Sequence, residues 1–374
     1  MSQTNLLSSS ALSLFRQRGT GSATWTSLSL VAATVISVPI VVVLSFVFIP
    51  ATDVWRHLVD TVLVRYITNT AWLVLGVGLG TFLIGAGGAW LVTMCRFPGQ
   101  RWFEWALFLP LAVPAYVLAY TYTGMLEFSG PVQSFLRETF EWSRADYWFP
   151  DVRTLGGAIT MLALVLYPYV YMLARAAFME QSVCVIEVSR TLGCSPWQSF
   201  RRIALPLARP ALATGIALAV METLGDFGTV QFFAVDTFTT GIFRTWFGLG
   251  DVAAAAQLAA MLLIFVFIAL YVERRSRGAA RYHHTSTRYR PLRPFALRGG
   301  WAALAWAVCF FPVFFGFILP AGVITVWAIE TAPEILGRAF VELVANTVTV
   351  AGLAAVLSVL VALGLGYGLR LGAT

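Results

Sequence analysis

Between two long apolar segments, the sequence reads Glu187-Val-Ser-Arg-Thr-Leu-Gly193-Cys-Ser-Pro-Trp-Gln-Ser-Phe-Arg-Arg-Ile203-Ala-Leu205-Pro206. This polar stretch predicts two short helices with a break between them. We expect the break at Gly193, because glycine adopts the positive φ of a helix C′ residue without a Cβ clash. We expect the second helix to end at Pro206, since proline lacks the backbone donor that would continue it.

Both short helices are predicted to be amphipathic. In the first, Cys184, Val188 and Leu192 recur at every fourth position and therefore share one face. The second begins at Ser195, a predicted N-cap, and Gln198 completes a capping box with it. Nothing nearby in the sequence covers the apolar residues of the second helix, which are Trp197, Phe200 and Ile203. Exposed aromatic side chains beside a membrane predict a protein partner.

The spacing of this stretch resembles the signature loop of binding-protein-dependent ABC importer permeases, which reads Glu-Ala-Ala, then Gly, then Ile-x-Leu-Pro at fixed intervals. Five positions match the signature, and Val188 and Ser189 replace its two alanines. In that family the loop is the cytoplasmic coupling helix, which docks on the ATPase subunit. The resemblance implies a coupling loop over 184–206 that uses Glu187, Val188, Leu192, Gly193, Trp197, Phe200, Ile203, Leu205 and Pro206.

The composition requires a lipid-exposed protein. Of the 374 residues, 59% are hydrophobic and only 11% are charged, whereas soluble domains are roughly 25% charged. A soluble core could not absorb this much apolar sequence. All 25 basic residues are arginines, so the chain has no lysine for a nucleotide-binding P-loop or a Schiff base.

The cysteines and histidines predict neither a disulfide framework nor a metal site. No two of the four cysteines form a C-x-x-C pair, and the three histidines do not form an H-E-x-x-H motif. We therefore expect no cofactor and no stable metal in this chain. The net charge of +7 follows from membrane topology, as shown below, and we expect no nucleic-acid partner.

Eight apolar stretches are long enough to cross a bilayer. They lie at about 28–49, 70–94, 103–126, 155–178, 210–234, 250–272, 300–328 and 346–369. The first is longer than the apolar region of a signal peptide, so we expect it to be retained. Residues 1–27 then form a cytoplasmic segment, and 28–64 contain the first span with an external loop.

The arginines predict the orientation of these spans. With a cytoplasmic N-terminus, the cytoplasmic segments between spans contain 17 arginines and the segments on the other side contain seven. Short cytoplasmic loops are enriched in basic residues, so the stretch at 187–206 is predicted to be cytoplasmic. The resemblance implies a multi-pass protein of the bacterial inner membrane.

The sequence pattern restarts after a basic, proline-containing linker at 273–299. Asn69-Thr70 opens one glycine-rich span and Asn346-Thr347 opens a similar one. We therefore expect an all-α polytopic membrane protein with one type I ABC permease module at 65–272 and the incomplete start of a second at 300–374. The second copy has no signature loop, so we expect a fragment or truncated copy that needs a missing second half or a second copy.

Two acids lie within one predicted span. Glu222 and Asp226 are four residues apart, so they are expected to share a helix face. Facing lipid would be costly, and we expect them to line the bundle interior or a water-filled path. Tyr116 and Tyr120 share a face of another span and are further candidates for the pathway. Hydrogen bonding to a neighbouring helix for the acids, and an interfacial aromatic belt for the tyrosines, are the structural alternatives.

Prolines are expected to kink or unwind two of the spans. Pro110 and Pro114 lie in the span at 103–126, and Pro168 lies in the span at 155–178.

A second stretch of sequence narrows the resemblance to one group of these permeases. Glu222-Thr-Leu-Gly-Asp226-Phe-Gly-Thr-Val230, followed by Phe238-Thr-Thr-Gly and Arg244-Thr-Trp, is similar to ferric-iron importer permeases. Those proteins fuse two permease modules in one polypeptide. The similarity extends well over 65–272 and loosely over 300–374.

These resemblances imply the translocation subunit of an ABC importer, with no catalytic residues of its own. Its partners would be a cytoplasmic ABC ATPase dimer that uses ATP, a periplasmic or lipid-tethered binding protein, and the lipid bilayer. Ferric iron is the expected substrate, and thiamine, a polyamine, a phosphonate or an inorganic anion are alternatives. An intramembrane enzyme that uses Glu222 and Asp226 as acid and base, or an ion-driven transporter, remains a rival.

Overall fold

The computed structural model describes residues 20–180, 191–277 and 294–372, and these residues are almost entirely helical. The elements up to the predicted coupling loop are α2 (Thr20–Ser45), the 3₁₀ turn η1 (Phe46–Phe48), α3 (Thr52–Thr61), α4 (Leu63–Met94), β1 (Cys95–Arg96), α5 (Gln100–Ala106), the 3₁₀ turn η2 (Leu109–Ala112), α6 (Ala115–Leu126), α7 (Pro131–Phe140) and α8 (Leu155–Glu180).

The remaining elements include three π-helical turns, η3 to η5. In chain order they are α10 (Pro196–Ser199), η3 (Phe200–Ala204), α11 (Leu205–Leu207), α12 (Arg209–Gly225), α13 (Gly228–Phe232), α14 (Phe238–Phe243), η4 (Arg244–Gly248), α15 (Val252–Arg277), β2 (Phe295–Ala296), α16 (Gly300–Val313), η5 (Phe314–Ile318), α17 (Leu319–Ile335) and α18 (Arg338–Gly372).

The helices confirm an all-α polytopic membrane protein. Six segments in the described residues are long and apolar enough to cross a membrane, and two bent helix pairs raise the possible number to the predicted eight. One bent pair, 100–112 with 115–140, turns through 86° where Pro110 and Pro114 interrupt the helix, as expected. In contrast, α8 continues through Pro168 without unwinding.

The chain forms two compact units. One comprises Ile49–Trp327, and the other combines residues 1–48 with 328–374, of which 20–48 and 328–372 are described. The modules expected from the sequence were divided at the 273–299 linker, but the larger unit continues across that linker. Its boundary lies within α17, at Trp327.

The first span of the expected second module is part of the core of the larger unit. Strand β2 pairs in parallel with β1, which places Phe295 opposite Cys95. From there α16 buries Ala305, Cys309 and Val313 completely or nearly so. The Trp306 ring packs edge-on against Phe103 of α5, with 6.0 Å between ring centroids. These contacts join residues about 200 positions apart, on either side of the linker at 273–299.

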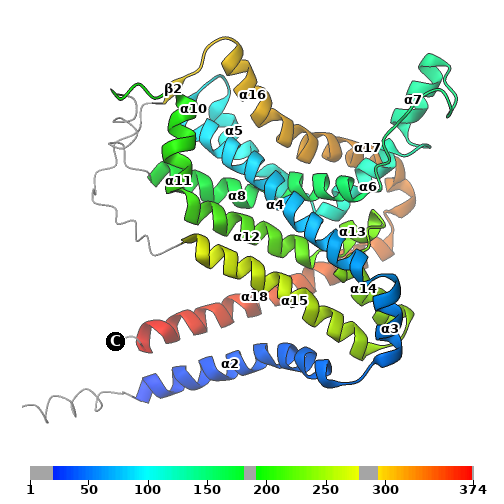
Figure 1. Ribbon diagram of the computed structural model, residues 1–374, viewed down its shortest axis with the longest axis vertical. Helices are drawn as coiled ribbons and strands as arrows, with labels where there is room; N and C mark the ends of the chain where they lie inside the picture. Colours follow the sequence, from blue (N-terminus) through cyan, green and yellow to red (C-terminus); the bar gives the residue numbers. More distant parts are fainter. Residues whose placement is uncertain (1–19, 181–190, 278–293, 373–374) are drawn as a thin grey trace, which may run out of the picture. The chain divides into compact units, whose positions relative to one another are not determined.

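The centre of this unit is a close contact of α4, α8 and α12, which lie side by side (Figure 1). A Cβ added at Gly85 of α4 would lie 2.8 Å from the Cβ of Val170, and one at Gly215 of α12 would lie 2.8 Å from its Cα. Val170 is fully buried between them. Small residues allow this approach, which maximises van der Waals contact between helices in a bilayer.

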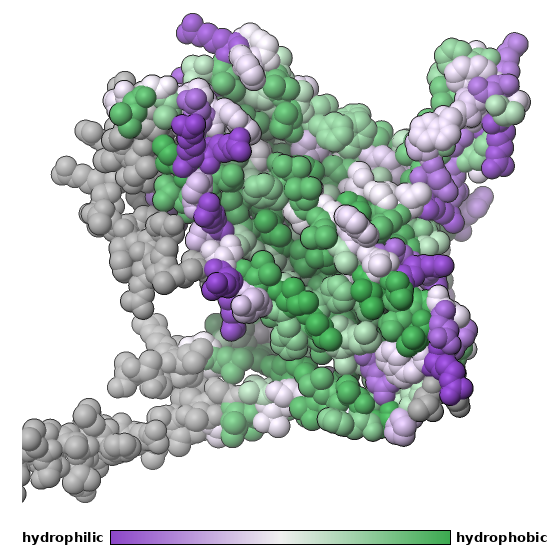
Figure 2. Space-filling view, viewed as in Figure 1, coloured by the Kyte–Doolittle hydropathy of each residue, from purple (hydrophilic) through white to green (hydrophobic). Residues whose placement is uncertain are grey.

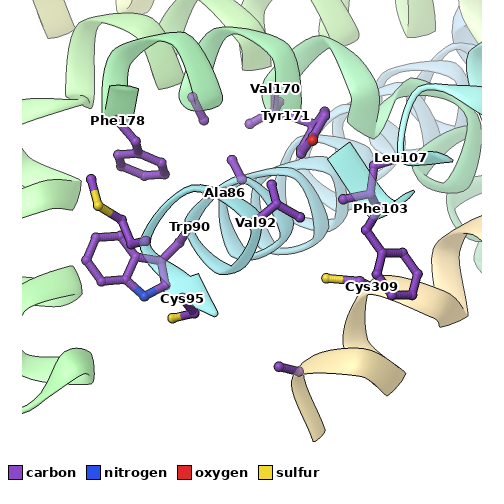
Figure 3. Close-up of a cluster of buried hydrophobic side chains, with 14 of the residues drawn as sticks. Ala86, Trp90, Val92, Cys95, Phe103, Leu107, Val170, Tyr171, Phe178 and Cys309 are labelled. Atoms are coloured by element: carbon purple, nitrogen blue, oxygen red, sulfur yellow. The ribbon is translucent and has the colours of Figure 1, made fainter. Parts of the chain in front are cut away.

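An aromatic cluster completes the packing at one end of these helices. Trp90, Phe178 and Tyr171 lie together with Cys309 of α16 (Figure 3). The outer surface of the same unit presents a broad hydrophobic area over α4 and α12, as expected for contact with lipid (Figure 2).

Candidate coupling loop and translocation path

The predicted coupling loop is described from residue 191 onward, so Glu187 and Val188 lie outside the described residues. Gly193 adopts φ +78°, which confirms the predicted break. The capping box is also present: the backbone N–H of Gln198 donates to Ser195 Oγ at 3.3 Å, and the backbone N–H of Ser195 donates to Gln198 Oε1 at 3.0 Å. Local sequence signals therefore fix this turn.

The apolar residues of the predicted coupling loop differ in their exposure. Trp197 is 65% exposed and Leu192 is 77% exposed, which leaves both available to a partner. Phe200 is buried, whereas the sequence predicted an exposed side chain. Its ring packs against the rings of Trp90 and Phe178, with 5.1 and 6.3 Å between ring centroids. Phe200 therefore anchors the loop to the bundle.

The second short helix does not end at Pro206. Phe200–Ala204 form a π-helical turn, and α11 carries Pro206 within its first residues. Residues 196–207 form one helix with a π-helical turn before Pro206, and this helix ends one residue later, at Leu207. The chain instead bends at Ala208, where 196–207 and 209–225 meet at 75°. Ile203, Leu205 and Pro206 are half-buried along this bend.

The predicted span at 210–234 is interrupted. Helix α12 ends at Gly225, and Asp226 has extended backbone angles. The Asp226 carboxylate accepts hydrogen bonds from Thr229 Oγ1 at 2.9 Å and from the Val230 amide at 3.1 Å. The Thr239 hydroxyl donates to the Asp226 carbonyl at 2.8 Å. The carboxylate of Asp226 thus stabilises the turn into α13.

Glu222 and Asp226 do not share a helix face, contrary to the sequence-based expectation. Glu222 is exposed on α12, whereas Asp226 follows the end of that helix and bonds within the next turn. Tyr169 of α8 lies within electrostatic range of Glu222 and was not identified from the sequence.

The two candidate tyrosines do share a face of α6. The rings of Tyr116 and Tyr120 both pack against Phe232 of α13, each with 5.9 Å between centroids. The Arg153 guanidinium lies 5.3 Å from the same Phe232 ring and pairs with Glu127 at 2.7 Å. Neither Phe232 nor Arg153 was identified from the sequence, because their partners are distant along the chain. Glu127 lies 26 positions before Arg153, and Tyr116 and Tyr120 lie more than 110 positions before Phe232.

The Asn69-Thr70 pair of α4 has a structural role in this region. Asn69 Nδ2 donates to the carbonyl of Asp236 at 2.9 Å, and Thr70 Oγ1 accepts from the Phe238 amide at 3.3 Å. The Asp236 carboxylate pairs with Arg65 and Arg244. These contacts hold the segment that precedes α14 against the beginning of α4.

The described residues contain no group of three or more histidine, cysteine, aspartate or glutamate side chains that converge as metal ligands. No disulfide joins Cys95, Cys194 and Cys309 within the part of the chain that the structure describes. The region around the end of α12 therefore combines an exposed carboxylate, Glu222, with an aromatic cluster formed by Tyr116, Tyr120 and Phe232.

Comparison with known proteins supports this description. Residues 76–278 match the family described as "Binding-protein-dependent transport system inner membrane component". The Fe(3+)-transport system permease protein FbpB 2 of Haemophilus influenzae is 29% identical over 80% of this chain and 55% of its own length. The molybdenum transport system permease protein ModB of Escherichia coli is 29% identical over 51% of this chain and 85% of its own length.

Other relatives differ in substrate. The sulfate transport system permease protein CysT of Salmonella typhimurium is 34% identical over 39% of this chain and 50% of its own length. This chain therefore spans about half the length of several relatives that it matches. These names describe transport permeases and not enzymes, as the sequence predicted.

A solved structure has the same fold. It is a chain of a bacterial ABC transporter involved in the import of the acidic polysaccharide alginate, with a TM-score of 0.53 at 18% identity, covering 67% of this chain and 96% of its own. Because the family match extends over more than half of the sequence, the chain belongs to the inner-membrane permease family of binding-protein-dependent ABC transporters.

Proposed function

We propose that this chain forms part of the translocation path of an ABC importer. A separate cytoplasmic ATPase dimer binds and hydrolyses ATP, and an external binding protein delivers the substrate. A second permease half, from a longer polypeptide or a second copy, completes the path. The N-terminus is cytoplasmic in this proposal, as the arginine distribution predicts.

One observation carries the proposal. The capped turn at 193–199 presents Leu192 and Trp197 outward, while Phe200 fastens the same turn to Trp90 and Phe178. An exposed aromatic residue on a rigid support is the usual form of an interface anchor. Movement of a partner bound there is transmitted to α12 through the bend at Ala208.

We propose ferric iron as the substrate. Support comes from the similarity to permeases named for Fe(3+) transport and from Glu222, an exposed carboxylate within a span. A charge in that position favours a water-filled path over lipid, and Fe³⁺ prefers oxygen ligands. Asp226 is less available, because two hydrogen-bond donors already engage its carboxylate.

Import of an oxyanion is the second candidate, since sulfate and molybdate permeases are also similar to this chain. Thiamine, polyamine and phosphonate import remain further alternatives. Radiolabelled uptake by cells with the full transporter distinguishes them: we expect Fe³⁺ uptake that deletion of the gene abolishes. Fe³⁺ uptake that survives deletion, with loss of sulfate or molybdate uptake, would contradict the iron assignment alone.

Truncating Trp197 tests the permease assignment itself. We expect Trp197→Ala to weaken co-purification of the ATPase at least tenfold, because removal of an interface anchor commonly costs about 2 kcal/mol or more. Trp72→Ala is the matched control, since Trp72 is equally exposed at 64% but lies on α4. Equal ATPase recovery and equal transport in both variants would contradict the coupling role.

A further inference from the structure

Exposed arginines gather at the joint between β1 and β2, which connects the end of α4 to the start of α16. In β1, Cys95 is buried and Arg96 is exposed, and the paired residues Phe295 and Ala296 alternate in the same direction. Residues two positions apart on an extended strand share a face. Arg298, which is also exposed, therefore follows Ala296 on the outer face beside Arg96. The spacing of paired strands places the Cα atoms of the two arginines within about 10 Å of each other.

A third exposed arginine lies on the adjoining turn. Arg101 is the second residue of α5, which begins directly after Gly99. The backbone N–H of Trp102 donates to the Gly99 carbonyl at 2.9 Å. The Gln100 side chain donates to the Val92 carbonyl at 2.5 Å, which ties the turn to the end of α4. Helix α5, β2 and the start of α16 thus lie together at one end of the larger unit (Figure 1).

These three arginines have no acidic partner among the residues that the structure describes. The ion pairs there involve other arginines, namely Arg65, Arg153, Arg175 and Arg244. Glu104 is the only acid of α5, and it pairs with Arg175 of α8 at 3.2 Å. Three neighbouring positive charges repel one another, and a bound anion relieves that repulsion.

Two apolar stripes that extend from the joint indicate the medium around it. The stripe on α16 consists of Trp301, Leu304, Val308 and Phe311. The stripe that runs from α5 into η2 consists of Trp102, Trp105 and Leu109. Each set recurs every three or four positions, so its members share one exposed face. Each stripe has tryptophan at the end next to the arginines and purely hydrocarbon side chains beyond it.

This order of side chains is that of a helix end at a membrane surface. Tryptophan is enriched at the level of the lipid headgroups, and arginine extends from there towards water and phosphate. The tryptophans are strongly exposed, Trp105 at 77% and Trp301 at 72%. A continuous hydrocarbon stripe beyond them favours lipid over a water-soluble protein as the neighbour of this surface.

We propose that Arg96, Arg101 and Arg298 together bind the headgroup of an anionic phospholipid, flanked by Trp102 and Trp301. Guanidinium groups donate paired hydrogen bonds to phosphate oxygens, which suits them to this ligand. The bound headgroup connects three segments of the chain and so holds the start of α16 to the end of α4. This inference goes beyond the proposed function, because it depends on neither the substrate nor the ATPase.

Native mass spectrometry of the full chain in detergent tests the proposal. Dioleoyl-phosphatidylglycerol is the anionic probe, and dioleoyl-phosphatidylcholine is the zwitterionic one. We expect the unmodified chain to retain the anionic lipid at least fivefold more than the zwitterionic lipid. Combining Arg96→Gln, Arg101→Gln and Arg298→Gln should remove this preference. The corresponding lysine substitutions should keep at least half of it, because the charge remains.

Arg56→Gln combined with Arg144→Gln is the matched control. Both arginines are exposed and have no ion pair among the described residues, and they lie on α3 and after α7, away from the joint. We expect lipid retention within twofold of the unmodified chain. Unchanged retention in the glutamine variant, or an equal loss in the control, overturns the proposal.

Two further measurements separate the lipid from other occupants. Excess inorganic phosphate should not displace the anionic lipid, and displacement would show a site for free anions instead. Loss of ATPase recovery in the glutamine variant, with lipid retention unchanged, would assign the surface to the ATPase. If the triple variant fails to fold, each single glutamine substitution should lower retention at least twofold, and no loss in any of them overturns the proposal.

Discussion

Helices α4 and α18 each contain an Asn-Thr pair within their first ten residues and have similar apolar sequences, yet the environments of the two helices differ. A third of the apolar window of α4 is buried, whereas none of the corresponding window of α18 is buried. In α4, Asn69 and Thr70 hold the 236–238 segment. In α18, Asn346 and Thr347 are exposed, and the Thr347 hydroxyl bonds back to the Leu343 carbonyl of its own helix at 2.9 Å.

This contrast shows what the repeated pattern specifies. It encodes an apolar helix with a polar pair in its first part, and both copies form that helix. Burial depends on the surrounding elements, because α4 is covered by α8, α12 and α16. Substitutions at equivalent kinds of position in the two helices should therefore differ greatly in effect.

The largest expected effect is at the loop residue that covers the end of α4. Phe200→Ala removes a ring packed between Trp90 and Phe178, and such truncations cost about 3–5 kcal/mol. We expect a strongly lowered thermal unfolding midpoint of the detergent-purified chain. Trp197→Ala should leave that midpoint nearly unchanged, because Trp197 is exposed. Similar midpoints for both variants would contradict the anchoring role of Phe200.

A smaller effect is expected at the contact between α4 and α8. Gly85→Leu places side-chain atoms where Val170 lies, since even a Cβ would be 2.8 Å from that residue. Overpacking of this kind costs about 1–3 kcal/mol. Gly352→Leu in α18 is the control, because nothing lies within 4 Å of its added Cβ. Thermal unfolding of both variants should show destabilisation in Gly85→Leu alone, and equal destabilisation would contradict the comparison.

The smallest effect is expected at the paired asparagines. Asn69→Ala removes the 2.9 Å hydrogen bond to the Asp236 carbonyl, which costs about 0.5–1.5 kcal/mol. Asn346→Ala should change stability by less than about 0.5 kcal/mol, since Asn346 is exposed. Chemical unfolding curves of the two variants measure this difference. A larger loss for Asn346→Ala would show that α18 is packed in a way that these contacts do not include.

The sequence predicted most of the helical organisation. The positions of the spans follow from apolar length, because a bilayer requires about 20 such residues. The turn at Gly193 and the Ser195–Gln198 capping box follow from local backbone chemistry. The interruption at Pro110 and Pro114 follows from missing donors. Each of these features depends on residues within a few positions of one another.

Several features of the candidate sites could not be predicted. The burial of Phe200 requires Trp90, which is 110 positions earlier in the chain. Asp226 leaves the helix face of Glu222 because Thr229, Val230 and the Thr239 hydroxyl provide partners for its carboxyl and carbonyl groups. A helical repeat alone cannot reveal such competition.

By itself, the sequence determined the membrane class, the approximate positions of most apolar helices, and the coupling signature, because these are set by local hydrophobicity, capping and spacing. Only the tertiary structure decided that α16 joins the core of α4, α5 and α8, that Phe200 is an anchor while Trp197 is exposed, and that Arg153 lies over the Phe232 ring. These outcomes depend on which distant surfaces meet, and the hydrophobic pattern of one segment contains no information about its partner.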